Sequence, residues 1–471
     1  MKKIHRLSIG IMACYFGLYI IIAMSFVIDQ PFGSPPDEYN RYRIPQYIAE
    51  NGTLPNGYDE AIRIPGYGFS YAFQPILPYI FQGWVMRIVG LFTDSPEAFV
   101  YAARSVNFLL GLIMAFLVLL LAKKWFQKAC WQWLFAFLVT FLPQSIFIHT
   151  YVNTDSCCML SIVLMLYGLT RGLRDDFSWR SSLIMAIGII LCALSYYNAY
   201  GFVLSCILLF AANYLHKSGK SLNLQWKELL KKGGLIAALV LLGIGWWFIR
   251  SYILYDGDFL GLKAREYCAS LYGNENYLPA NRATWKNLGY SVWDMLVQSN
   301  FLISSQMSFI GVFGSMSIDT SIWVYRFYRV LFFAGSVMCL AIPASKVKDV
   351  DGGAAQFGNR KYLERFFHLN MLFCIVMPLI LSIHYSYATD FQPQGRYLLP
   401  ALVPLAYYCI RGIEKTLGVV HGWLSLKAFD MNRWQRFEWI IVGVLCLLIA
   451  VCLIVSVYGY VFPYYAANPV V

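Results

Sequence analysis

The sequence predicts an all-α integral membrane protein with about eleven transmembrane helices. Of its 471 residues, 59% are hydrophobic and only 13% are charged. Soluble domains carry about 25% charged residues, so about half of the usual surface charge is missing. Apolar stretches of about 20 residues recur along the chain, and each can cross a bilayer as a helix. This composition excludes a water-soluble enzyme, a disordered chain and a nucleic-acid-binding domain.

The first apolar stretch, about residues 8–28, follows a basic start at Lys2, Lys3 and Arg6. We interpret it as an anchor because it is long for the apolar part of a signal peptide. A cleaved signal peptide is the alternative, since residues 23–25 resemble a cleavage site. The other spans are expected at about 99–121, 131–148, 154–170, 181–197, 200–215, 233–254, 323–342, 367–385, 397–413 and 439–459.

The distribution of charge gives the expected orientation of these spans. With the N-terminus inside, the inner segments hold 24 of the 37 Lys and Arg but 9 of the 25 Asp and Glu. Cytoplasmic loops carry an excess of Lys and Arg. We therefore expect a cytoplasmic N-terminus and an outer C-terminus, with the net charge of +12 concentrated on the cytoplasmic side. The basic segment 217–232 is expected to be an amphipathic helix on anionic lipid.

Two further apolar stretches, 72–92 and 293–317, compete as spans. They contain the polar or helix-breaking residues Gln74, Pro75, Pro78, Arg87, Gln298, Asn300 and Gln306. Broken helices at membrane depth are tolerated only where protein or water surrounds them, so we interpret both stretches as segments at the outer membrane face. The chain then forms one transmembrane domain, 1–471, with large outer loops at 29–98 and 255–322.

A pair of adjacent carboxylates, Asp37 and Glu38, follows Pro35 and Pro36 about ten residues beyond the first span. Pro suits the start of a helix, and acids in a first turn are favoured by the helix dipole. Helix capping is therefore one interpretation. In a cavity at the membrane interface, however, one carboxylate can act as a general base while the other orients it or binds a metal. The residues alone leave both interpretations open.

Arginines near the outer ends of spans are candidates for binding phosphate, because the planar guanidinium matches its geometry. Arg396 is the first candidate, since it stands between the polar Gln394 and Tyr397 at the start of an apolar stretch. An arginine that anchors a helix end is the alternative. The further candidates at outer span ends are Arg104, Arg250, Arg326, Arg329 and His384.

The tight outer turn before span four contains Asn153 and Asp155. Either residue can cap the following helix, but an acid at the end of a span also suggests contact with substrate or a metal. No cluster of Asp or His marks a metal cage, so we expect no required cofactor, with a divalent cation as the alternative.

Several segments in order along the chain resemble the GT-C superfamily of membrane glycosyltransferases. In that superfamily an Asp-Glu pair follows the first span in an outer loop with interfacial helices, as Asp37 and Glu38 do here. The other segments that resemble it are 73–79, 103–111, 245–258, 308–314 and 394–400. The last two are similar to a bacterial branch. The chain departs from the superfamily in its short second outer loop and in having no outer domain after the last span, which makes a peptide acceptor less expected.

The resemblance implies a glycosyltransferase in the bacterial plasma membrane, with its active site facing outside. It would move a hexose or pentose from a polyprenyl-phosphate donor to a polysaccharide or lipid acceptor of the cell envelope, with Asp37 as general base and Glu38 as helper. The expected phosphate-binding residues are Arg396, Arg104, Arg250, Arg326, Arg329, Tyr397 and His384. The other expected substrate-binding residues are Arg41, Gln74, Asn153, Asp155 and Gln394. Membrane lipids are expected partners, and nucleic acid is not.

The tyrosines of the first outer loop could stack on sugars or form an interfacial aromatic belt. They are Tyr39, Tyr42, Tyr47, Tyr58, Tyr67, Tyr71 and Tyr79. Two other functions remain alternatives. A transporter or flippase for lipid-linked sugars places its binding residues at the membrane midplane, whereas the acids and arginines here cluster outside. An O-antigen-type polymerase or ligase would place an Arg- and His-rich site in a late loop.

Overall fold

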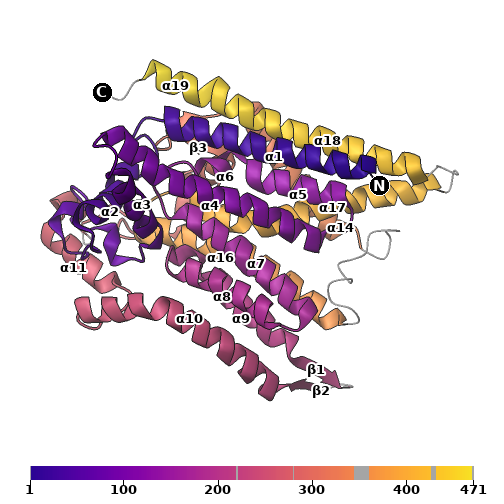
Figure 1. Cartoon of the computed structure of the whole chain (residues 1–471), viewed down its shortest axis with the longest axis horizontal. Helices are drawn as coiled ribbons and strands as arrows, with labels where there is room; N and C mark the ends of the chain where they lie inside the picture. Colours follow the sequence, from indigo (N-terminus) through magenta and orange to yellow (C-terminus); the bar gives the residue numbers. More distant parts are fainter. Residues whose placement is uncertain (1, 219–220, 279–280, 344–359, 426–430, 469–471) are drawn as a thin grey trace.

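The computed structural model describes residues 2–218, 221–278, 281–343, 360–425 and 431–468. Long helices run side by side in a bundle, and some of the shorter helices gather at one end of it (Figure 1). In the described residues the strands form two short antiparallel pairs, β1–β2 and β3–β4. The expected all-α membrane fold class is confirmed.

The long helices are α1 (Lys2–Asp29), α4 (Pro96–Trp125), α7 (Asp155–Asp175), α10 (Trp226–Leu254), α14 (Ile322–Ala341), α16 (Lys361–Ala388), α17 (Leu402–Ser425) and α18 (Met431–Ser456). The shorter α-helices are α2 (Glu38–Asn51), α3 (Leu77–Val89), α5 (Ala129–Phe141), α6 (Pro143–Phe147), α8 (Trp179–Ala193), α9 (Tyr200–Asn213), α11 (Leu262–Tyr272), α12 (Val292–Gln298), α13 (Phe301–Gly311) and α19 (Phe462–Ala467). Single turns are η1 (Glu60–Ile62), η2 (Tyr71–Phe73), η3 (Tyr197–Ala199), η4 (Glu275–Tyr277), η6 (Gly395–Ala401) and the π-helical η7 (Val457–Val461). The strands are β1 (Leu215–Ser218), β2 (Ser221–Leu224), β3 (Val312–Phe313) and β4 (Ile318–Asp319).

Seven helices of the described chain are long and apolar enough to cross a membrane, and each coincides with an expected span. They contain α1, α4, α7, α10, α14, α16 and α18. The four other expected spans fall on the shorter α5, α8 and α9 and on η6 with α17. The total of eleven therefore stays a prediction.

The two stretches that competed as spans are built from short helices. The stretch 72–92 contains the 13-residue α3, and 293–317 contains the 11-residue α13. Helix α3 buries one face, with Tyr79, Gln82 and Met86, and leaves Phe81, Trp84 and Ile88 exposed on the other. This two-sided character suits a helix that lies along a membrane surface.

The expectation of one amphipathic helix over 217–232 is wrong. Residues Leu215–Ser218 and Ser221–Leu224 pair as the antiparallel strands β1 and β2, and α10 begins only at Trp226. The Gln225 amide donates a hydrogen bond to the Tyr214 carbonyl at 3.0 Å, which closes the hairpin in front of the helix. Strand pairing thus uses the backbone groups that a helix would have needed.

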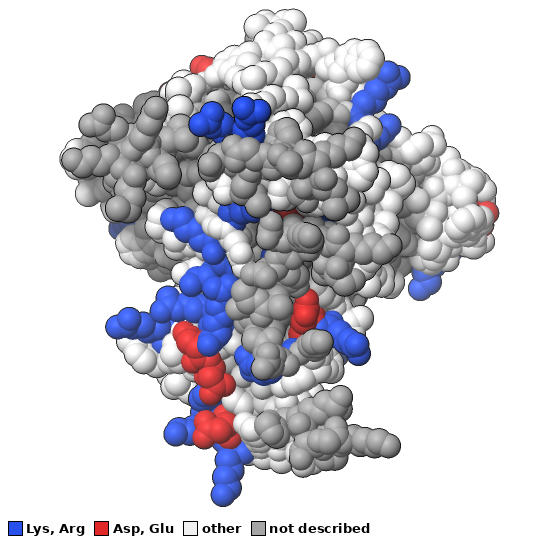
Figure 2. All heavy atoms as spheres, turned by 90° about the vertical axis from the view of Figure 1, so that its right-hand side faces the viewer, with Lys and Arg blue, Asp and Glu red and all other residues white. Residues whose placement is uncertain are grey.

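The two ends of the bundle differ in structure. Helices α2, α3 and α11 lie at one end, called here the large-loop end, and the chain finishes there after α19 (Figure 1). The N-terminus and the β1–β2 hairpin lie at the other, called here the basic end, where Lys and Arg side chains gather (Figure 2). The helix termini that supply them include Lys123, Lys124, Arg171, Arg174, Lys227, Lys231 and Lys232. Several of the Lys and Arg residues expected on the inner side therefore lie at the same end of the bundle.

Close helix packing in the bundle depends on small residues. Gly335 on α14 faces Gly412 on α17, and a Cβ added at Gly412 would collide with the Gly335 carbonyl oxygen. It would also stand 2.7 Å from the Cys339 amide nitrogen. Glycines allow helix backbones to approach in this way in membrane proteins.

We expect Gly412→Ala to destabilise the protein by about 1–3 kcal/mol, because backbone atoms cannot move aside as a side chain could. Thermal unfolding in detergent measures the change. The matched control is Gly443→Ala on α18, where an added Cβ meets no atom within 4 Å. Equal unfolding temperatures for the two variants would contradict this account of the α14–α17 contact.

Candidate functional site

A cavity of about 290 Å³ lies at the large-loop end. Its lining comes from the start of α2, the segment 64–79, the turn between α8 and α9, α11, the end of α16 and the loop 390–397. The polar and aromatic lining residues are Asp37, Asn40, Arg41, Tyr67, Phe69, Tyr71, Gln74, Tyr79, Thr154, Ser195, Tyr196, Tyr197, Asn198, Arg265, Arg282, Ser382, Tyr385, Asp390, Gln392 and Tyr397. Both large loops thus contribute to one cavity.

Asp37 faces this cavity from a strained backbone position. Its φ is 62° and its ψ is 4°, in the left-handed region that Asp tolerates better than most residues. Such a conformation costs about 1–3 kcal/mol and persists where the surroundings fix it. Although Asp37 precedes α2, its side chain makes no capping hydrogen bond. The capping interpretation therefore does not account for this carboxylate.

Two buried arginines hold the Asp37 carboxylate. Arg396 Nη2 donates to Asp37 Oδ2 at 2.8 Å, and Arg41 Nη2 lies 3.7 Å from the same oxygen. The Asp37 side chain itself is 34% exposed, so substrate can reach it. Burial alone would raise the pKa of Asp37, but the charges of Arg396 and Arg41 and their hydrogen bonds bring it below its ordinary value. The carboxylate is therefore ionised at neutral pH.

Arg41 and Arg396 have N–H groups that make no hydrogen bond among the described residues. Arg41 Nη1 donates to Tyr79 Oη at 3.1 Å and to Thr154 Oγ1 at 3.4 Å, and its guanidinium stacks over Tyr71 at 4.8 Å. Arg41 Nε and Arg396 Nε and Nη1 are buried and have no hydrogen-bond partner among the described residues. Buried guanidinium donors without partners are costly, and a bound anion would satisfy them.

A chain of hydrogen bonds orients Arg396. Its Nη2 also donates to Tyr397 Oη at 3.2 Å, and the Tyr397 hydroxyl donates in turn to Gln392 Oε1. Gln392 Nε2 donates to Asp390 Oδ2 at 2.6 Å. Because Arg can only donate and a carboxylate can only accept, the direction of every bond in this chain is fixed. Asp390 thus fixes the orientation of the residues beside Asp37.

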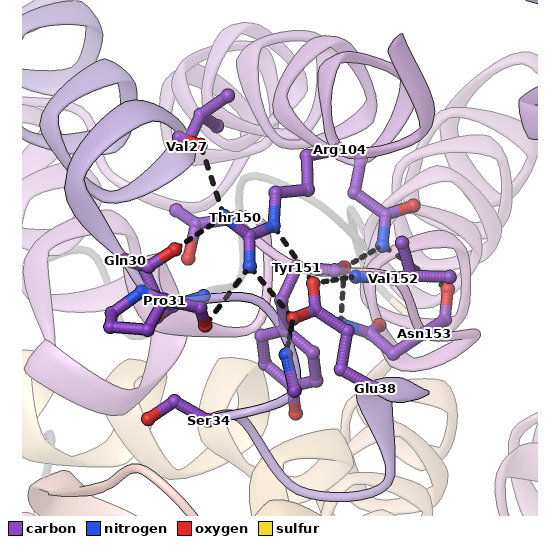
Figure 3. A network of polar contacts seen from close by, with 12 residues as sticks. Val27, Gln30, Pro31, Ser34, Glu38, Arg104, Thr150, Tyr151, Val152 and Asn153 are labelled. Atoms are coloured by element: carbon purple, nitrogen blue, oxygen red, sulfur yellow. Dashed lines mark hydrogen bonds and ion pairs between the residues drawn. The ribbon is translucent and has the colours of Figure 1, made fainter. Parts of the chain in front are cut away.

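Glu38 has a different environment from Asp37 (Figure 3). It is fully buried, and its carboxylate accepts hydrogen bonds from Arg104 Nε at 2.8 Å and Nη2 at 2.7 Å. The backbone amides of Gly33 and Val152 donate to it at 3.0 and 3.1 Å. Its acceptor sites are occupied, and it does not line the cavity. The geometry therefore favours a structural role for Glu38 over that of a catalytic helper.

Arg104 likewise donates all its hydrogen bonds to groups of the protein. Besides Glu38, its guanidinium donates to the backbone carbonyls of Val27, Gln30 and Pro31 at 2.8–3.4 Å (Figure 3). The pair ties the end of α1, the start of α2, α4 and the turn before α7 together. No donor of Arg104 is left for a phosphate. Its position is that of a structural residue.

The other expected site residues divide into two groups. The expected residues that line the cavity are Asp37, Arg41, Gln74 and Tyr397. Arg396 contacts Asp37 but does not itself line the cavity. The expected residues that do not line it are Glu38, Arg104, Arg250, Arg326, Arg329, His384, Asn153, Asp155 and Gln394.

The residues outside the cavity have their own partners or positions. Arg250 Nη2 donates to the Pro55 carbonyl at 2.7 Å and joins α10 to the first loop. Asn153 accepts from the Ser156 amide at 3.0 Å, which is the capping role that the sequence allowed. Asp155 is buried at the start of α7, near enough to act electrostatically on Arg396.

Three more of these residues lie away from the cavity. Arg326 stacks over Trp323 at 4.9 Å on the exposed side of α14, one turn from the half-buried Arg329. His384 is exposed on α16. None of the three is placed to hold an anion beside Asp37.

Sequence reasoning missed several residues of the lining. They are Asn40, Tyr196, Tyr197, Asn198, Arg265, Arg282, Asp390 and Gln392. Asp390 and Gln392 stand just before Arg396 in a short polar loop, a spacing that could have indicated them. Arg265 and Arg282 carry no local signal, because only the fold of the second loop brings them to the cavity. Of the loop tyrosines, Tyr67, Tyr71 and Tyr79 line it.

No group of three or more His, Cys, Asp or Glu side chains that could hold a metal ion occurs among the described residues. The second carboxylate of the lining, Asp390, interacts with Gln392. A divalent cation at this site therefore remains a proposal that the donor set alone does not require.

Comparison with known proteins identifies the family of this chain and its fold. The profile of a family described as "Predicted membrane protein (DUF2142)" matches residues 63–405. This chain belongs to the DUF2142 family. No curated protein matches the chain.

Solved structures show which fold this DUF2142 chain has. It is similar to the archaeal oligosaccharyltransferase AglB from Archaeoglobus fulgidus in complex with an inhibitory peptide and a dolichol-phosphate, with a TM-score of 0.52 and 14% identity. The alignment covers 94% of this chain and 55% of that one. The apo form of the Archaeoglobus fulgidus oligosaccharyltransferase gives a TM-score of 0.51, 14% identity, and coverage of 94% and 56%. The chain therefore spans somewhat over half the length of these proteins and has the GT-C fold that the motifs indicated.

We expect Arg104→Ala to destabilise the protein by about 3–5 kcal/mol, because it leaves the Glu38 carboxylate buried and unpaired. Thermal unfolding of the purified protein measures the loss. Lys232→Ala is the matched control: it breaks the Lys232–Asp176 pair, in which the Asp176 side chain is 64% exposed, and should cost about 1 kcal/mol or less. A stable Arg104→Ala variant would show that the network does not hold the Asp37 loop.

Proposed function

We propose that this protein is a glycosyltransferase that moves a sugar from a polyprenyl-phosphate donor to a glycan or lipid acceptor of the cell envelope. One observation carries the proposal: within a GT-C fold, the one-third exposed carboxylate of Asp37 lies beside two buried arginines with donors that find no partner among the described residues. A base and an anion site are the two groups that transfer from a phosphate-linked sugar requires.

The reaction would proceed as a single displacement. The acceptor hydroxyl attacks the anomeric carbon, and its oxygen forms the new glycosidic bond while the bond to the phosphate oxygen breaks. The proton of the hydroxyl passes to the Asp37 carboxylate, and the electron pair of the broken bond leaves on the phosphate. Arg396 and Arg41 would stabilise that charge through charge-assisted hydrogen bonds. Displacement in one step inverts the anomeric centre.

The donor would also prepare the base. Arg396 and Arg41 stabilise Asp37 as an anion, and such a carboxylate is a weak base. A phosphate that binds the same guanidiniums adds a negative charge close to Asp37 and competes for its partners. The pKa of Asp37 then rises, because a like charge disfavours ionisation. Donor binding would thus make Asp37 a better proton acceptor.

The distribution of charge supports a location for the protein. The basic end would face the cytoplasm of a bacterial plasma membrane, in line with the excess of Lys and Arg on cytoplasmic loops. The large-loop end and its cavity would then lie at the outer face. The dolichol-phosphate bound by the archaeal neighbour supports a lipid-linked donor for this fold.

We expect Asp37→Asn to lower the rate of transfer by at least about 10²-fold, because general-base catalysis contributes about 10²–10⁴-fold. The measurement is transfer of a labelled sugar from a polyprenyl-phosphate donor by the full chain in proteoliposomes. Asp294→Asn on α12 is the control, since this exposed carboxylate caps a helix and should leave the rate unchanged. Scrambling of the lipid-linked sugar without transfer by the wild type would point to a transporter instead.

We expect the acid limb of the pH profile to differ between kcat and kcat/KM. Activity falls as Asp37 becomes protonated, so each limb reports the pKa of this group, in the complex for kcat and in the free enzyme for kcat/KM. The arginines depress the pKa in the free enzyme, so its limb should lie below the limb of kcat. Coincident limbs would argue against competition between the phosphate and Asp37 for the arginines.

A further inference from the structure

The cavity has a second wall, formed by Tyr67, Phe69, Arg265 and Arg282, that the proposed reaction does not use. The segment that carries Tyr67 and Phe69 is fixed to α11 by two hydrogen bonds, from Cys268 Sγ to the Gly68 carbonyl at 3.2 Å and from the Asn274 amide to the Gly66 carbonyl at 2.8 Å. Gly68 has a φ of 76°, and a Cβ there would collide with the Gly273 backbone. Hydrogen bonds and close packing thus hold this wall in place, as they do the wall that carries Asp37.

Two arginines on this wall, Arg265 and Arg282, line the cavity. The Arg265 guanidinium stacks over the Phe69 ring at 4.3 Å, which supports its plane and leaves its edge accessible. Arg282 Nε donates to the Tyr277 carbonyl at 3.1 Å. In the part of the chain that the structure describes, neither guanidinium forms an ion pair with a carboxylate. Among the described residues, the wall thus carries two positive charges with no carboxylate at ion-pair distance.

The carboxylates of the cavity are used elsewhere. Asp37 interacts with Arg396 and Arg41, and Asp390 accepts from Gln392 in the chain of bonds that leads to Tyr397. Tyr67 packs against Tyr277 with a distance of 4.6 Å between ring centroids, and this places an aromatic ring among the cations of the wall. An aromatic ring offers an apolar surface on which a sugar can stack, and an arginine fork suits a carboxylate or a phosphate.

We infer that the second wall is the acceptor subsite and takes a glycan that carries an anionic group, a carboxylate or a phosphate. This inference deepens the proposed function and rests on it, because a bound glycan is an acceptor only if the protein transfers a sugar. The donor phosphate would occupy Arg396 and Arg41, so the anion on the second wall belongs to the other substrate. A neutral glycan would leave Arg265 and Arg282 without counter-charge when it fills the cavity.

Binding of small probes to the full chain in lipid nanodiscs tests the inference without any transfer. The probes are methyl glucuronide, glucose 6-phosphate and neutral methyl glucoside, followed by saturation-transfer nuclear magnetic resonance. We expect the wild type to bind at least one charged probe about tenfold or more tightly than the neutral one, and the tighter charged probe names the anion. Arg265→Gln with Arg282→Gln should abolish this preference, and Arg265→Lys with Arg282→Lys should retain part of it.

The matched control is Lys263→Gln with Lys286→Gln, which removes the same charge from the same loop at exposed residues outside the cavity lining. It should keep the preference. Equal binding of charged and neutral probes by the wild type would overturn the inference. Weaker binding of polyprenyl phosphate by the Arg265→Gln and Arg282→Gln variant would also overturn it, because the wall would then serve the donor. A wild type that prefers charged probes but transfers no sugar would contradict the proposed function and not the anion subsite.

Discussion

The buried ion pair between Glu38 and Arg104 is the constraint on which the site depends. It joins the end of the first span to α4 and to the turn before α7, and it does so immediately beside Asp37. A left-handed Asp is unfavourable on its own. Because Glu38 is held on both carboxylate oxygens, the residue before it is forced into that conformation and its side chain is directed to the cavity.

The two adjacent carboxylates therefore have different roles, although the sequence shows both simply as neighbouring acids. Glu38 is buried without solvent contact and accepts hydrogen bonds from one arginine and two amides, whereas Asp37 is one-third exposed and shares two arginines with the cavity. Environment rather than residue type separates them. The same holds for the arginines: Arg104 uses its donors on Glu38 and on backbone carbonyls, whereas two nitrogens of Arg396 have no partner in the part of the chain that the structure describes.

Much of the fold could be predicted from the sequence, because apolar length and the bias of Lys and Arg are physical requirements of a bilayer. The seven long helices follow from those requirements. The stretches 72–92 and 293–317 needed a further signal, since only their polar and helix-breaking residues argued against ordinary spans. The β1–β2 hairpin could not be predicted from the amphipathic pattern of 217–232, since the pairing depends on backbone contacts that close at Gln225. In the site, Asp37 and Arg396 lie 359 positions apart, yet the neighbouring residues in the sequence made each of them a candidate. Arg265 and Arg282 were not marked, because their role depends on a loop conformation that no short pattern encodes.

The central claim is that Asp37 and Arg396 form the place where a lipid-linked sugar phosphate binds. A structure of the full chain with a polyprenyl phosphate tests it most directly. The account predicts the phosphate within hydrogen-bond distance of Arg396 Nε or Nη1, with the Asp37 carboxylate turned toward the cavity beside it. A phosphate bound elsewhere, with the Arg396–Asp37 pair unchanged, would contradict it.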